Sequence, residues 1–147
     1  MRKLNEICTD LKELLAEHFA TVRVTSAQIS EQFLLELKVI SPAKLPAVVI
    51  VFEQSSFSSE NTIRELRLSL VLINAFVAGS EERTLSVFEA YEKLLGIFTP
   101  DGLTYNDVFY LPAECYAASA DKNFACLALT LIVKQGTLSL IHISEPT

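Results

Sequence analysis

The chain has 147 residues, a length that suits one domain built around a single hydrophobic core. Its composition, 50% hydrophobic and 20% charged, is too apolar for a disordered chain. The net charge of -6 argues against nucleic acid as a partner, because proteins that hold phosphate backbones present clustered lysine and arginine.

The compartment is suggested by the N-terminus, the apolar runs and the cysteines. No apolar run approaches the roughly 20 residues that a helix needs to cross a bilayer, so we expect no membrane contact. Glu6, Asp10 and Glu13 interrupt the region where a signal peptide would be apolar. The three cysteines form no CxxC pair, which fits reduced thiols better than a disulfide framework or a zinc site. We therefore expect the chain to mature in a cytoplasm.

The last ten residues, LSLIHISEPT, resemble the translation of a sequencing adapter that appears at the ends of misassembled reading frames. Such a segment is excluded from reasoning about the fold. We predict that residues 1–137 form a single domain and that residues 138–147 are an artefactual or disordered tail. The alternative is a genuine short strand from Leu138 to Ile143.

The first half of the chain predicts one helix followed by strands. Apolar residues recur every three or four positions from Leu4 to His18, with charged residues opposite, as in an amphipathic helix. A short strand is expected at Thr21 to Thr25. Residues Gln32 to Ile40 alternate in a way that predicts a half-buried strand. The continuous Val and Ile run from Ala47 to Phe52 predicts a central strand covered on both faces.

The second half predicts a long strand, a second helix and two further strands. After a polar loop at residues 54–62, Ile63 to Phe76 predicts a long strand antiparallel to Ala47 to Phe52. Ser80 is the expected cap of a helix. The apolar positions of that helix are Leu85, Phe88, Tyr91, Leu95 and Phe98. Strands at Thr104 to Leu111 and Phe124 to Lys134 flank a long connection at residues 112–123. The fold class is therefore α+β, a mainly antiparallel sheet of about five to six strands with two helices packed on one face.

The residues offer no catalytic or metal-binding pattern. The motifs GxSxG, HExxH and GxxxxGK[ST] are absent from the sequence. His18 is interpreted as a structural or capping histidine on the apolar side of the first helix. Paired carboxylates such as Glu81 and Glu82 are interpreted as solvated charge. We therefore expect no enzyme, no catalytic or metal-ligating residue and no cofactor.

A binding or structural role directs attention to residues that could meet a partner. Phe57 is the aromatic of the polar loop, and Arg64, Glu65 and Arg67 begin the long strand beside it. These three charges could form salt bridges between subunits, the alternative being solvated strand charges. Tyr110 and Tyr116 are candidate interface anchors near the 112–123 connection, the alternative being the edge of the core.

A resemblance to a known family follows from several segments together. These are the opening amphipathic helix, LPAVVIVFE, the strand Arg64 to Ala75, VFEAYEKLLG before a PDG turn, and FACLALTLIV. Over residues 3–134 the layout resembles the Mu-like phage family of small tail proteins related to tail terminators. The resemblance implies a protein that caps the tail tube, stops its polymerisation and mediates head–tail joining, commonly as a ring of six copies.

The resemblance also implies partners and location. The partners would be other copies of the chain, tail tube proteins and head-connector proteins, in the virion tail and, during assembly, in the host cytoplasm. A ring uses heterologous contacts, so each subunit presents two different patches. The loops at 54–62 and 112–123 are candidates for these patches. Edge strands at Gln32 to Ile40 or Thr104 to Leu111 could instead pair between subunits.

Two other interpretations compete with this one. An acidic, dimeric type III secretion chaperone is also small, cytoplasmic and built from helices and strands, although that family usually ends with a further helix. A small ligand-binding domain would need a pocket with convergent polar groups, for which the sequence gives no sign.

Overall fold

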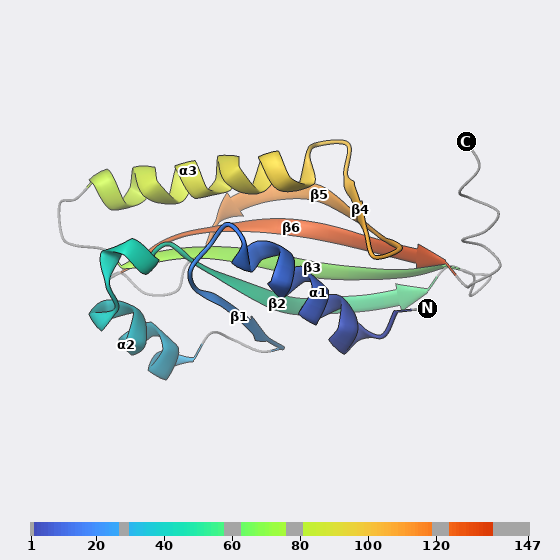
Figure 1. Cartoon of the computed structure of the whole chain (residues 1–147), viewed down its shortest axis with the longest axis horizontal. Helices are drawn as coiled ribbons and strands as arrows, with labels where there is room; N and C mark the ends of the chain where they lie inside the picture. Colours follow the sequence, from blue (N-terminus) through green and yellow to red (C-terminus); the bar gives the residue numbers. More distant parts are fainter. Residues whose placement is uncertain (1, 27–29, 58–62, 76–80, 119–123, 137–147) are drawn as a thin grey trace.

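The computed structural model describes residues 2–26, 30–57, 63–75, 81–118 and 124–136. The predictions for the tail at 138–147, the cap at Ser80, and residues 58–62 and 119–123 of the two loops therefore lie outside the described residues. Over the described part the chain forms three α-helices, one short 3-10 helix and six strands (Figure 1). In chain order these are α1 (Leu4–Ala16), β1 (Val22–Thr25), α2 (Glu31–Val39), the 3-10 helix (Pro42–Lys44), β2 (Ala47–Phe57), β3 (Ile63–Ala75), α3 (Glu81–Phe98), β4 (Leu103–Tyr105), β5 (Val108–Ala117) and β6 (Phe124–Gly136). The predicted α+β class is confirmed.

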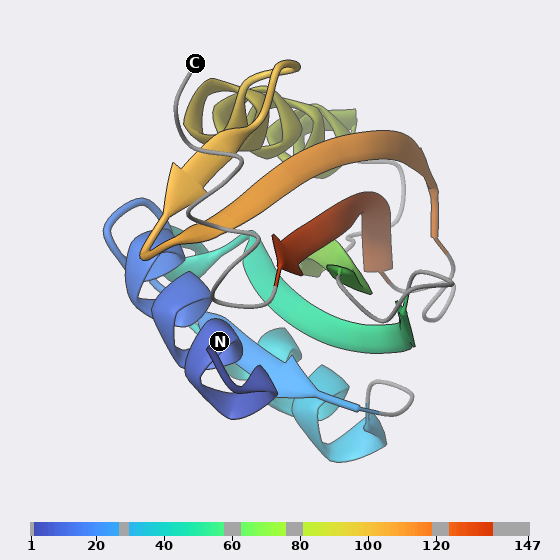
Figure 2. The same cartoon turned by 90° about the vertical axis from the view of Figure 1, so that its right-hand side faces the viewer.

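The strands form one six-stranded sheet in the order β1-β2-β3-β6-β5-β4. Only the β1–β2 pair is parallel, and all the other neighbours are antiparallel. The expected antiparallel partnership of β2 with β3 is confirmed, and β2 lies inside the sheet with Ala47 to Ile50 buried. Viewed from its end, the sheet is strongly curled, and α1 lies on the same side as both edge strands (Figure 2).

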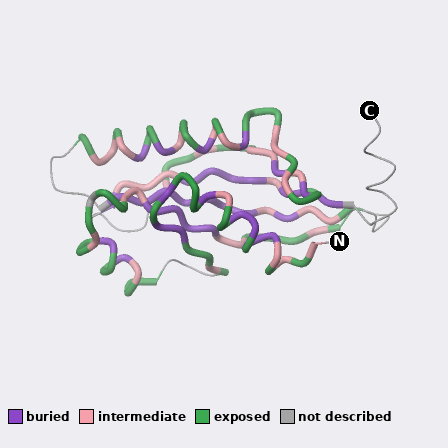
Figure 3. Tube along the Cα trace, viewed as in Figure 1, coloured by how far each residue is buried: buried purple, intermediate pink, exposed green. Residues whose placement is uncertain are grey.

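Helices cover both faces of this sheet. On one face, α1 and α3 bury a cluster with alternate residues of the strands, including Leu66, Leu68 and Leu70 of β3. On the other face, α2 covers a smaller cluster that includes Val49 and Val71. The two helices expected on one face are α1 and α3, and α2 is a third helix that the sequence did not predict. The buried parts of the trace run along the middle of the sheet (Figure 3).

The strand predicted from Gln32 to Ile40 is wrong, because this segment is α2. The Ser30 hydroxyl accepts a hydrogen bond from the Phe33 amide at 3.2 Å, which caps the helix and satisfies one of its free donors. Leu34 and Leu37, three residues apart, point into the second core cluster. The segment therefore fits both the alternation of a strand, at Phe33, Leu35, Leu37 and Val39, and the spacing of a helix. The alternation alone did not distinguish the two structures.

Two predicted loops are shorter than expected. Strand β2 continues to Phe57, so residues 54–57 belong to the sheet and pair with β3 after an irregularity between Phe52 and Gln54. Strand β5 continues to Ala117 and takes in the first half of the predicted 112–123 connection. It too has an irregularity, between Pro112 and Glu114. Each extra residue is accommodated by a local bulge, which a strict alternation pattern does not anticipate.

The predicted strand Thr104 to Leu111 is divided into a hairpin of β4 and β5. Asn106 and Asp107 adopt φ angles of 48° and 65°, a left-handed conformation that Asn and Asp tolerate better than most residues. This pair turns the chain back on itself. The three-residue β4 is therefore the edge strand at this side of the sheet, and β1 is the edge strand at the other.

Candidate interface surfaces

Phe57 ends β2 and is 58% exposed, which is unusual for so large an apolar side chain. Ile63, the first residue of β3, is exposed nearby at the same end of the strands. Phe57 pairs with Arg64, so it lies on one face of the sheet and Ile63 on the other, and we call the strand tip that carries both residues the strand-end surface. Its position at the tip of the two long strands agrees with the expectation that Phe57 is available to a partner, although Phe57 lies in a strand rather than a loop.

The three candidate charges beside Phe57 have partners within the chain. Arg64 donates to the backbone carbonyl of Arg2 at 2.8 Å. Arg67 faces Glu114 of β5 and Glu65 faces Lys134 of β6, each with 4.0 Å between the nitrogen and the carboxylate oxygen. Both ion pairs are largely exposed, so each contributes little to stability. The geometry places Glu65 and Arg67 in cross-strand pairs of one subunit and Arg64 against the segment before α1.

Hydrogen bonds to Arg2 connect the N-terminal segment to the sheet. The Arg2 carbonyl also accepts a hydrogen bond from the Gln135 side chain at 3.0 Å, and its guanidinium Nε donates to Asp10 at 3.1 Å. Asp10 is buried, and its hydrogen bond and charge raise the pKa of Arg2. The carbonyl of Arg2 therefore joins α1 to β3 and β6, and it explains why Arg64 points inward.

Tyr110 is fully buried, so the expectation that it anchors an interface has to be corrected. It belongs to the main core cluster, and its ring lies 6.1 Å from that of Phe98 of α3. The hydroxyl has no hydrogen-bond partner among the described residues. Burial, followed by the charge of Asp10, raises the pKa of Tyr110 far above its usual value. The alternative of a core residue fits Tyr110, whereas Tyr116, 44% exposed near the end of β5, remains accessible.

A second exposed surface lies on α2. Leu35 is 60% exposed and Val39 is 86% exposed, four residues apart on one side of the helix. We call these two residues the α2 surface. The sequence pattern missed it, because in the predicted strand Leu35, Leu37 and Val39 would have shared one face. The capping Ser30, the acidic first turn and the Leu34–Leu37 spacing are the signals that would have identified it.

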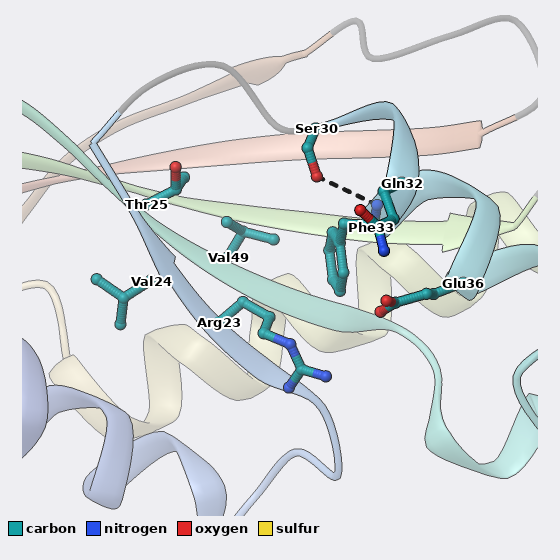
Figure 4. A pocket seen from close by; sticks show the side chains of 8 residues that line it. All are labelled: Arg23, Val24, Thr25, Ser30, Gln32, Phe33, Glu36 and Val49. Carbon is teal, nitrogen blue, oxygen red and sulfur yellow. Dashed lines mark hydrogen bonds between the residues drawn. The ribbon is translucent and has the colours of Figure 1, made fainter.

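A shallow pocket of about 400 Å³ lies between α2 and edge strand β1. Arg23, Val24 and Thr25 of β1 form one wall, and Phe33 and Glu36 of α2 form the other (Figure 4). The Arg23 guanidinium carbon lies 5.6 Å from the centre of the Phe33 ring, a cation–π contact. The pocket is open and mixes polar with apolar atoms.

Three further observations on the described residues concern His18, possible metal ligands and Cys8. His18 is exposed beyond the end of α1 rather than on its apolar side, and its carbonyl accepts a hydrogen bond from Lys93 at 3.0 Å. No group of three or more His, Cys, Asp or Glu side chains gathers there as a metal site. Burial raises the pKa of the Cys8 thiol, which makes that thiol less reactive. No described helix is long and apolar enough to cross a membrane.

The chain matches no protein-family model and no curated protein sequence. Function is therefore inferred from the fold and from the exposed surfaces described above.

Proposed function

We propose that this protein is a structural phage tail-completion protein, a tail terminator that assembles as a ring of six copies and caps the tail tube. The observation that carries the proposal is a pair of unlike apolar surfaces far apart on one subunit. The α2 surface and the strand-end surface lie at opposite ends of the long axis (Figure 1). The layout of helices and strands, which resembles the tail-terminator family, supplies the function.

Two unlike surfaces favour a ring over a two-fold dimer. In a two-fold dimer the same patch meets itself, so one patch is enough. In a ring each subunit offers one patch to the subunit before it and a different patch to the subunit after it. Val39 and Leu35 would meet Phe57 and Ile63 of the next subunit, burying apolar side chains that a monomer leaves in water.

The partners in this proposal are further copies of the chain, the tube protein and the head connector. In a ring, both end faces remain free to meet other components after the subunits have closed on one another. One end face would stop tube growth and the other would receive the head. The sites of action would be the virion tail and, during assembly, the host cytoplasm.

A mixing experiment tests the head-to-tail contact directly. Val39→Glu and Phe57→Glu each place a charge in one of the two surfaces, and both positions are exposed, so both variants should fold. Each variant alone should fail to form rings. A mixture should give complexes of two chains, because one intact α2 surface and one intact strand-end surface remain to be joined. Light scattering measures the mass.

The control for this experiment is Thr104→Glu, another exposed strand residue that belongs to neither surface. It should assemble as the unaltered chain does. Val39→Glu or Phe57→Glu variants that still assemble fully would contradict the proposed contact. An unaltered chain that forms only a compact dimer would favour the chaperone-like alternative.

A further inference from the structure

One flank of α3 combines exposed apolar residues with a pocket. Leu85 is 55% exposed and Phe88 is 47% exposed, and they lie one turn apart. Beside them is a cavity of about 390 Å³ with a mostly apolar lining. Its walls are Thr84, Val87 and Phe88 of α3, Ala117 of β5, and residues 124–127 of β6. We call Leu85, Phe88 and this cavity the α3 surface.

The sequence analysis counted Leu85 and Phe88 among the apolar positions of the predicted helix, and in the structure both are exposed. The residues of α3 that face the sheet are Val87, Ala90, Leu94 and Phe98, all buried. This stripe already supplies the packing that holds the helix on the sheet. The exposure of two further large apolar side chains outside this stripe therefore needs another explanation, and a contiguous exposed patch of this kind marks interaction sites.

Charge around the α3 surface indicates the chemistry of its partner. Glu81 lies four residues before Leu85, and Glu92 lies four residues after Phe88. All four residues therefore follow one stripe of the helix. Glu82 and Glu89 are also exposed and flank that stripe. Glu81 and Glu82 suit the positive end of the helix dipole, but Glu89 and Glu92 lie beyond the first turn and gain little from it.

The two basic residues of α3 do not neutralise these glutamates. Arg83 turns toward β3 and donates to the Asn74 side chain at 3.4 Å. Lys93 donates to the carbonyl of His18, and its ammonium lies 5.0 Å from the centre of the Phe19 ring. The outward side of the helix thus presents four carboxylates around an apolar centre.

We propose that the α3 surface binds a basic segment of another protein, which inserts an apolar side chain into the cavity beside Phe88 and places Lys or Arg against the glutamates. A second copy of this chain is the poorer occupant, because the chain carries 18 acidic against 12 basic residues and like charges oppose that contact. This surface is separate from the two proposed ring contacts, so it would serve a partner that the ring recruits.

The test uses the full chain and a fluorescently labelled amphipathic peptide with leucines on one side and lysines on the other. Fluorescence anisotropy should show binding that weakens as salt is added. Phe88→Ala should weaken it by about tenfold or more, as for a central apolar anchor. Glu89→Gln combined with Glu92→Gln should weaken binding at low salt and reduce its salt dependence.

Matched controls keep the test specific. Val24→Ala removes a similarly exposed apolar side chain from β1, outside all three named surfaces, and should leave peptide binding unchanged. A peptide with glutamates in place of the lysines should not bind. Any one of three results would overturn the proposal. These are equal peptide binding by Phe88→Ala and the unaltered chain, binding of the acidic peptide, and no peptide binding by the unaltered chain. Loss of ring mass in Phe88→Ala would also overturn it, by assigning the α3 surface to the subunit contact.

Discussion

In Tyr110 the ring is in a favourable environment and the hydroxyl is in an unfavourable one. Its ring fills the core, whereas its hydroxyl is buried without a described partner. We predict that Tyr110→Phe raises the free energy of unfolding by about 1 kcal/mol, because it removes an unpaired buried hydroxyl and keeps the ring. Urea unfolding at neutral pH measures this. Tyr116→Phe, at an exposed position, should change it by less than about 0.5 kcal/mol.

The raised pKa of Tyr110 also predicts a pH dependence. The folded protein keeps the phenol protonated at a pH where the unfolded chain ionises it, near pH 10. The stabilisation from this group is therefore complete below about pH 10 and is lost as the pH rises further, by up to about 1.4 kcal/mol per pH unit. Unfolding measured between about pH 9 and about pH 11 should show a shallower loss for Tyr110→Phe. Identical slopes for the two proteins would contradict the assignment.

Among the secondary-structure elements, α2 offers the clearest test of sequence against structure. In a strand, Leu35 and Leu37 would share one face, whereas in a helix they point in different directions. Leu37 is buried and Leu35 is exposed. We predict that Leu37→Ala lowers the free energy of unfolding by about 2–4 kcal/mol and that Leu35→Ala lowers it by less than about 0.5 kcal/mol. Similar losses in urea unfolding would support the strand instead.

The elements that the sequence predicted correctly are those whose patterns allow one structure. The alternation at Ile63 to Ala75 is too regular to fit a helix, and the run at Ala47 to Phe52 is short and rich in β-branched Val and Ile, which favours a strand. The segment around Leu34 and Leu37 fits both periods, and only the cap and the sheet beneath it decide the outcome. For α3, Leu85 and Phe88 compete with the smaller Val87 and Ala90 for the core, and the choice depends on how closely the helix approaches the sheet.

The candidate interface residues also differ in how well the sequence could predict their positions. Phe57 and Tyr116 are exposed, as an interface would require. Tyr110 could not be assigned from sequence, because an aromatic residue in a strand can fill a core or anchor an interface. Arg64 turns inward because of the carbonyl of Arg2, a contact between residues 62 positions apart.

For the molecule as a whole, the three exposed apolar surfaces are proposed to make different contacts. The α2 surface and the strand-end surface are proposed to join neighbouring subunits, and the α3 surface is proposed to recruit a basic partner. Their separation on different elements means that a substitution in one should leave the other two intact, since effects at distant sites are usually additive. Phe88→Ala should therefore lose the peptide and keep the ring, and Val39→Glu should do the reverse.

The central claim is that six copies close into a ring, and the mass of the unaltered chain in solution tests it most directly. Size-exclusion chromatography with light scattering should give six times the chain mass of 16.3 kDa. A version of the chain ending at Thr137 should give the same ratio, since the residues proposed for the two contacts belong to α2, β2 and β3. A compact complex of two chains, unchanged on dilution and concentration, would contradict the ring and with it the proposed tail-terminator function.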